Sequence, residues 1–176
     1  MKQIREFTIS FGGLNVGKHH FEYSIDNSFF ENFEYSEIKT GKLKVELKLE
    51  KKVNMLILDF KINGTVNVPC DRCLDNFDFN ISAENRLIAK FGTKIFEESD
   101  EVIVINESDN QINIAHYIYE YIVLSLPYKL VHPENNNGTP SCNPEIISKL
   151  NEHLTKEDIE DDFDPRWNIL KNLNNN

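Results

Sequence analysis

Strict alternation of apolar and charged residues near the middle of the chain constrains its fold more than any other feature. Leucine or valine occupies every second position from Leu43 to Leu49, and lysine or glutamate fills the positions between them. This period of two is typical of a strand with one buried and one solvated face. A second apolar run at residues 55–62 follows the short stretch 51–54. We therefore predict an antiparallel hairpin.

The rest of the chain divides into a strand-like part and a helix-like part. Apolar residues also alternate in three shorter runs, at residues 4–11, 21–25 and 77–81, and a continuous apolar run at 102–105 is expected to extend the same sheet. Residues 29–38 fit either a short helix or an irregular crossing. Beyond residue 110 the apolar spacing changes to three and four, which predicts helices at about 114–126, after Asn143-Pro144 and after Asp164-Pro165.

These patterns predict an α+β fold. We expect an antiparallel β-sheet, which could close into a barrel, with the C-terminal helices packed on it. We expect one domain over residues 1–176. Strands would dominate 1–106 and helices 107–176, with an acidic linker at 155–164.

Charge and hydropathy narrow the possible partners and locations. The 176 residues include 29 Asp and Glu against 19 Lys and Arg, which gives a formal net charge of -10. Such a charge repels the phosphate backbone, so we expect no DNA partner and only local contacts with RNA. No stretch approaches the ~18 apolar residues of a membrane span, and the polar N-terminus does not resemble a secretion signal. We expect a cytoplasmic protein without a membrane partner.

The cysteines carry the most chemical information. Cys70 and Cys73 are separated by two residues, so a tight turn can aim both sulfurs at one tetrahedral Zn²⁺. His132 and Cys142 could supply the other two ligands and so fix the intervening loop against the sheet. We therefore expect one structural Zn²⁺ or no cofactor at all.

Other interpretations of these cysteines stay open. They could simply be buried apolar side chains. A redox pair fits less well, because the motif lies between expected antiparallel strands and not at the start of a helix that would lower a thiol pKa. A zinc-dependent hydrolase or nuclease would need an open ligand position and a base such as Glu134.

The turn with Cys70, Arg72, Cys73 and Leu74 resembles the signature of the YceD family, the large ribosomal RNA subunit accumulation proteins, long filed as a domain of unknown function. Other segments resemble the family too: residues 112–114 before a helix, the Leu-Ser-Leu-Pro run that ends at Pro127, and the positions of His132 and Cys142. The closing motif is made of Asp164, Pro165, Arg166 and Trp167.

This resemblance implies a bacterial protein without enzymatic activity that is needed for normal accumulation of large-subunit ribosomal RNA. The implied partners are a ribosomal protein, a precursor of that RNA, or both. Cys-rich members carry several cysteines in the C-terminal third, whereas this chain has only Cys142 there. That departure weakens the argument for a metal.

Three surfaces could contact such partners. Lys42, Lys44 and Lys48 on the central hairpin, with Arg72 nearby, could form an RNA-contacting face, although alternate lysines also commonly form the solvated face of a strand. The acidic residues 157–164 could bind a basic ribosomal protein or be a solvated linker. Trp167 could anchor a partner or dock its own helix.

Overall fold

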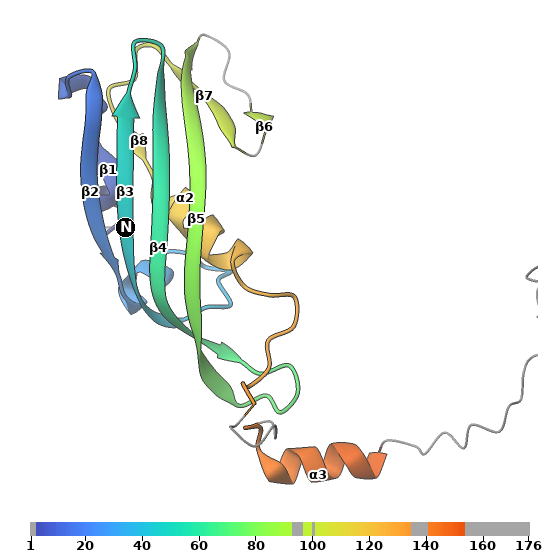
Figure 1. The fold of residues 1–176 in the computed structure, drawn as a ribbon. Helices are drawn as coiled ribbons and strands as arrows, with labels where there is room; N and C mark the ends of the chain where they lie inside the picture. Colours follow the sequence, from blue (N-terminus) through green and yellow to red (C-terminus); the bar gives the residue numbers. More distant parts are fainter. Residues whose placement is uncertain (1–2, 93–96, 100, 135–140, 154–176) are drawn as a thin grey trace, which may run out of the picture.

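Three long antiparallel strands form the centre of the molecule in this computed structural model, which describes residues 3–92, 97–99, 101–134 and 141–153. β3 (Thr40–Lys51), β4 (Met55–Pro69) and β5 (Asn76–Gly92) lie side by side (Figure 1). β3 and β4 make the expected hairpin, with Lys51 opposite Leu56. Leu47, Leu49 and Leu58 are fully buried, because the alternation places them on the covered face of the sheet.

In the part of the chain that the structure describes, the main sheet has six strands in the order β2-β3-β4-β5-β7-β6. β2 (Gly17–Ile25) pairs with β3, and β7 (Val102–Asn106) runs parallel to the end of β5. β6 (Glu97–Ser99) pairs with β7. Within the described residues no ladder joins β2 to β6, so the sheet is open. The α+β class is confirmed, and the sheet does not close into a barrel.

One face of the sheet is covered by short helices and a small second sheet (Figure 1). These elements are η1 (Gln3–Phe7), η2 (Phe11–Gly13), α1 (Asn27–Phe30), α2 (Ala115–Leu124), and the pair β1 (Thr8–Ile9) and β8 (Ile112–Asn113). The core between the layers is rich in aromatic and isoleucine side chains, including Phe7, Phe30, Phe60, Ile118 and Ile122.

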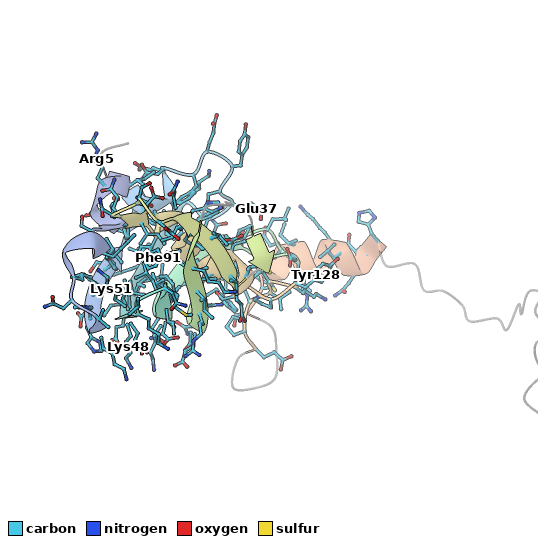
Figure 2. All side chains as sticks on the ribbon, turned by 90° about the horizontal axis from the view of Figure 1, so that it is seen from above. Arg5, Glu37, Lys48, Lys51, Phe91 and Tyr128 are labelled. Carbon is cyan, nitrogen blue, oxygen red and sulfur yellow. The ribbon has the colours of Figure 1, made fainter. Side chains whose placement is uncertain are left out.

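The opposite face of the sheet is solvated and carries both signs of charge. Figure 2, which looks along the strands, shows Lys48 of β3 on the side away from Arg5 of η1. Cross-strand ion pairs follow this face: Lys44–Glu22 at 3.0 Å, Lys61–Glu84 at 3.2 Å and Arg86–Asp59 at 2.6 Å. Exposed pairs of this kind each contribute at most about 1 kcal/mol. They identify the face as solvated.

Two predicted elements differ in the structure. The strand predicted at residues 4–11 is wrong over most of its length, because β8 offers β1 only two pairing residues and η1 and η2 flank it. Phe7 and Phe11 still point into the core, which explains the alternation. The segment that fitted a helix or a crossing starts with α1, whose first turn is capped by the Asp26 side chain.

The last described helix, α3 (Pro144–His153), lies beyond the lower end of the sheet (Figure 1) and buries none of its residues fully. Its predicted start at Asn143-Pro144 is confirmed, since the Asn143 side chain accepts a hydrogen bond from the Glu145 amide at 3.1 Å. The predicted acidic linker 155–164 and the helix after Pro165 lie outside the described residues. No helix in the described ranges is both long enough and apolar enough to cross a bilayer.

Candidate metal centre

The turn between β4 and β5 presents two cysteines to the same side. Pro69 ends β4, and the Cys70 amide donates to the Asp75 carbonyl at 3.0 Å, which closes the turn. Leu74 adopts a φ of 65° inside it and its amide donates to the Cys70 carbonyl at 2.9 Å. The chain thereby reverses tightly enough to bury both Cys70 (0% exposed) and Cys73 (2% exposed).

The segment after α2 runs alongside this turn and contributes the other two candidate ligands. The Asp71 amide donates to the Leu130 carbonyl at 2.7 Å, and the Leu130 amide donates to the Asp71 carboxylate at 2.6 Å. These two hydrogen bonds fix Leu130 beside the turn and thereby position His132, which lies two residues further along the chain. Asn143 donates to the Asp75 carboxylate at 3.0 Å, which positions the neighbouring Cys142.

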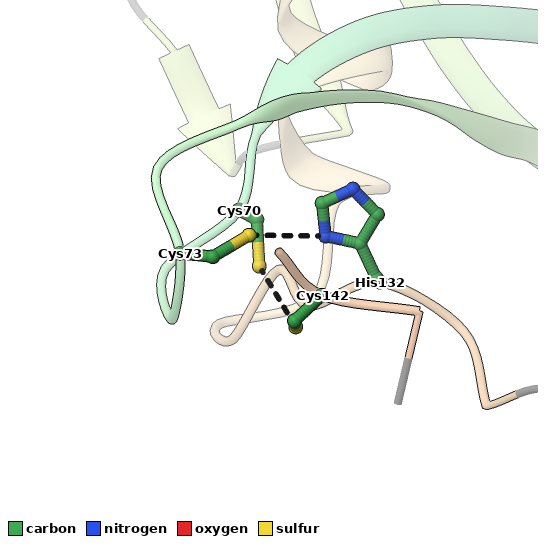
Figure 3. Close-up of side chains that lie close together, drawn as sticks. All are labelled: Cys70, Cys73, His132 and Cys142. Atoms are coloured by element: carbon green, nitrogen blue, oxygen red, sulfur yellow. Dashed lines mark hydrogen bonds between the residues drawn. The ribbon is translucent and has the colours of Figure 1, made fainter. Parts of the chain in front are cut away.

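The four side chains converge on one point (Figure 3). Cys70 Sγ lies 3.9 Å from Cys142 Sγ, and Cys73 Sγ lies 3.5 Å from His132 Nδ1. All four ligand atoms lie within 4.8 Å of one another. Ligand atoms of a tetrahedral zinc site with bonds of about 2.0–2.3 Å are about 3.5–3.8 Å apart. Two of the separations therefore match such a site, and the longest needs only a modest contraction.

An apolar shell surrounds the cluster. The Phe77 ring lies 4.7 Å from the His132 ring, centroid to centroid, and fixes one side of the imidazole. Val131 from the loop and Ile146 and Ile147 from α3 pack against the three cysteines. The cluster is therefore the place where α3 meets the rest of the molecule.

Local electrostatics favour a thiolate at one corner of the cluster. Burial raises the pKa of the Cys70 thiol, but the backbone amides of Cys73, Arg72 and His132 outweigh it and bring the pKa to about 6. Burial and the neighbouring Cys70 both raise the pKa of the Cys142 thiol. Negative charge thus concentrates where a cation would sit. A bound cation would favour the thiolate at every cysteine.

These residues could hold a metal ion through four protein atoms. Three sulfurs and one imidazole nitrogen are soft ligands that suit zinc. The cysteines are free thiols in this structure and lie in a turn between antiparallel strands. That context lacks the helix start expected for a thioredoxin-like redox pair.

The other residues singled out from the sequence fall in different places. The Arg72 amide, 3.4 Å from Cys70 Sγ, supports the thiolate, while Leu74 is exposed. Pro127 follows α2 and limits its extension. Lys42, Lys44 and Lys48 share the outer face of β3, where Lys44 is paired with Glu22 and Glu46. The motif of Asp164, Pro165, Arg166 and Trp167 lies outside the described residues.

Sequence reasoning missed the residues that position the ligands. Asp71, Asp75 and Phe77 touch the segments carrying His132 and Cys142 rather than the ligand point itself. The only available signal was their place beside the Cys-x-x-Cys pair. From the sequence alone, acidic residues beside two thiolates would be expected to repel them. The structure shows instead that the carboxylates of Asp71 and Asp75 accept hydrogen bonds from a segment that is distant in the chain.

Comparison with known families decides the assignment. The family model described as "Large ribosomal RNA subunit accumulation protein YceD" matches residues 58–174, well over half of the chain. The chain belongs to the YceD family. The matched YceD region contains all four candidate ligands and the groups that position them. No curated protein and no solved structure matches the chain significantly.

Proposed function

We propose that this YceD protein is a non-catalytic binding factor that supports accumulation of large-subunit ribosomal RNA by binding a ribosomal protein or a precursor of that RNA. Its family description supports the role in RNA accumulation. We further propose that one Zn²⁺, bound by Cys70, Cys73, His132 and Cys142, holds its C-terminal part in place.

The observation that carries the non-catalytic role is the composition of the cluster. Catalytic zinc sites keep a position open for water or substrate, whereas structural sites are closed by four protein ligands. Here four protein atoms converge, and three of them belong to buried cysteines. Glu134, one candidate for the base of a hydrolase, is exposed and does not belong to this group of ligands. A structural ion therefore fits this donor set better than a hydrolytic centre.

A structural ion at this point would connect elements that otherwise have few contacts. The cluster links the β4–β5 turn to the segment before α3, and α3 itself buries no residue fully. The metal bonds would thus hold α3 at one end of the sheet. We propose that this arrangement presents a binding surface of fixed shape to the ribosomal component.

The role in RNA accumulation is tested by depleting the protein from its host cells. We expect less large-subunit RNA relative to small-subunit RNA, restored by the wild-type gene and restored incompletely by a Cys70→Ser, Cys73→Ser variant. In a native lysate fractionated by density at low salt, the protein should sediment with large-subunit precursors. Unchanged RNA levels on depletion would contradict the proposed function.

The structural role of zinc is tested on the purified full-length chain. We expect one Zn²⁺ per chain, and a tetrahedral thiolate spectrum when Co²⁺ replaces it. RNA incubated with the metal-loaded protein should stay intact. Metal-dependent cleavage of RNA, or a coordination shell that contains an exchangeable water, would favour the hydrolase instead.

A further inference from the structure

Within the described residues, one edge of the main sheet is unpaired over part of its length. β7 pairs with β5 only from Ile88 onward, so the first part of β5, residues 76–87, continues past β7 (Figure 1). Among the described residues, no backbone hydrogen bond reaches residues 76–87 from that side. A long free edge is a template onto which another extended chain can pair.

The backbone groups that face this edge can be identified from the hydrogen bonds of β5. The Ile88 amide donates outward to the Glu101 carbonyl at 2.8 Å, whereas the Phe91 amide donates to Asn54 on the β4 side at 3.1 Å. Backbone groups alternate sides along a strand, so the even positions face the edge. These positions are Asn76, Asp78, Asn80, Ser82, Glu84 and Arg86.

A groove of about 1020 Å³ opens beside the free edge, lined by β5, the start of β7 and α2, and also by charged residues on the outer face of β3 and β4. Two polar atoms of residues that line it, Asn85 Oδ1 and the Tyr121 hydroxyl, are buried without a hydrogen-bond partner in the described structure. Tyr121 is only 7% exposed. Buried polar atoms normally find partners, so these two are suited to a ligand that supplies a donor and an acceptor.

The charge and apolar surface beside the edge indicate what such a ligand carries. The groove is lined by five acidic and three basic side chains, so its lining is acidic on balance. Two of the basic side chains, Lys61 and Arg86, are already paired with acidic neighbours. Glu101 and Glu120 form no ion pair with a described residue. Leu124 is 72% exposed next to them, and Phe77 and Phe79 on β5 are only half-buried. The whole chain has a net charge of -10. These features fit a basic chain that also brings apolar side chains.

We propose that the free edge of β5 accepts an extended Lys- and Arg-rich segment of a large-subunit ribosomal protein as an additional strand. Main-chain hydrogen bonds to the even positions would provide affinity, and alternate side chains of the segment would enter the groove and contact Glu101 and Glu120. The class of partner rests on the proposed function. The strand-addition geometry rests on the edge itself.

The test uses an array of overlapping peptides of about 15 residues that cover the proteins of the large ribosomal subunit, long enough to span the edge when extended. The full-length protein should bind a subset rich in Lys and Arg. Asn80→Pro removes one edge-facing amide without removing a bond to β4, and proline is tolerated at such edge positions. It should weaken binding by about tenfold or more, while the matched control Asn80→Ala should bind like the wild type.

Two further variants, which are expected to keep the fold, distinguish a loss of binding from misfolding of Asn80→Pro. Glu120 is exposed on α2, so Glu120→Lys should keep the melting temperature and still weaken peptide binding several-fold, more at low salt than at high salt. Tyr121→Phe removes the unpartnered hydroxyl and should weaken binding without loss of fold. Binding of single-stranded large-subunit RNA in place of peptides, or equal binding by all these variants, would overturn the proposal.

Hydrogen exchange gives a direct view of the geometry. A bound peptide from the array should slow exchange at the amides of Asp78, Asn80 and Ser82 and leave the odd positions, already bonded to β4, unchanged. In cells, if depletion lowers large-subunit RNA but Asn80→Pro restores it fully, the edge proposal fails and the proposed function stands. If depletion has no effect on the RNA, the proposed function fails, whatever the peptides do.

Discussion

Asp71 and Leu130 exchange two hydrogen bonds, one through each backbone amide, and this contact joins the two halves of the Cys/His cluster. Asp71→Ala removes the carboxylate that accepts from the Leu130 amide. We expect metal affinity to fall about tenfold, because groups that position ligands typically carry an effect of that size. Competition with a chromogenic chelator measures the affinity.

The variant Asp71→Asn is the matched control for Asp71→Ala. An amide oxygen can still accept from the Leu130 amide, so Asp71→Asn should keep most of the affinity. Equal affinities for wild type, Asp71→Asn and Asp71→Ala would mean that the contact does not position His132.

Loss of one ligand should release α3 without unfolding the sheet. Cys142→Ser should lower zinc affinity roughly 100-fold or more, because a hydroxyl replaces a thiolate. Amide exchange in residues 144–153 should then accelerate, while β3 and β4 keep their protection, since their buried core residues form a cluster of their own that, among the described residues, meets the cysteines only through Phe77.

Ser148→Ala, on the exposed surface of α3, is the matched control for Cys142→Ser and should change neither metal affinity nor exchange. Exchange by mass spectrometry with and without a chelator reports both regions. Simultaneous loss of protection in the sheet would show that the cluster and the sheet unfold as one unit.

Tyr121 should make the free energy of unfolding decrease as the pH becomes alkaline. Burial raises the pKa of its hydroxyl from 10.0 to about 12, so the folded state holds this proton more tightly than the unfolded state does. The corresponding stability is fully present below pH 10 and is lost as the pH rises toward 12. Tyr121→Phe should therefore lose less stability than the wild type over this interval. Urea unfolding at a series of pH values gives the difference, and parallel curves would contradict the assigned burial.

Gly64 of β4 lies directly opposite Leu43 of β3. Its φ of 152° favours glycine, and an added Cβ would overlap the Lys42 carbonyl oxygen and the Leu43 Cα. Gly64→Ala should destabilise the fold by about 3 kcal/mol or more. Gly13→Ala meets no atom within 4 Å and should stay within about 0.5 kcal/mol of the wild type. Thermal unfolding of the two variants side by side makes the comparison.

The parts of the fold that the sequence predicted are those with local causes. Alternation from Leu43 to Leu49 is a direct consequence of one covered and one solvated face, so the hairpin could be derived without knowledge of its neighbours. The segment that became η1, β1 and η2 shows the same alternation. That this segment contains only a two-residue strand could not be predicted, because the length of a strand depends on its partner, and β8 provides only two pairing residues.

The candidate site divides in the same way. Its ligands could be proposed because cysteine is rare in this chain and only Cys70, Cys73 and Cys142 were available. The groups that hold those ligands, and the free edge of β5, depend on how distant segments meet. No spacing along the chain reveals that the Leu130 amide donates to Asp71, or that the ladder between β5 and β7 begins only at Ile88 of β5.

The separation of the cluster's two halves along the chain also matters while the protein is being made. Cys142 follows Cys70 by 72 positions. At about 5–20 residues per second, the ribosome needs roughly 4–14 s to supply the last ligand after the first. For most of that interval, until His132 is made, the nascent chain carries Cys70 and Cys73 with no ligand from the other half of the cluster. The first thiols must therefore escape oxidation and premature metal capture until His132 and Cys142 have been synthesised.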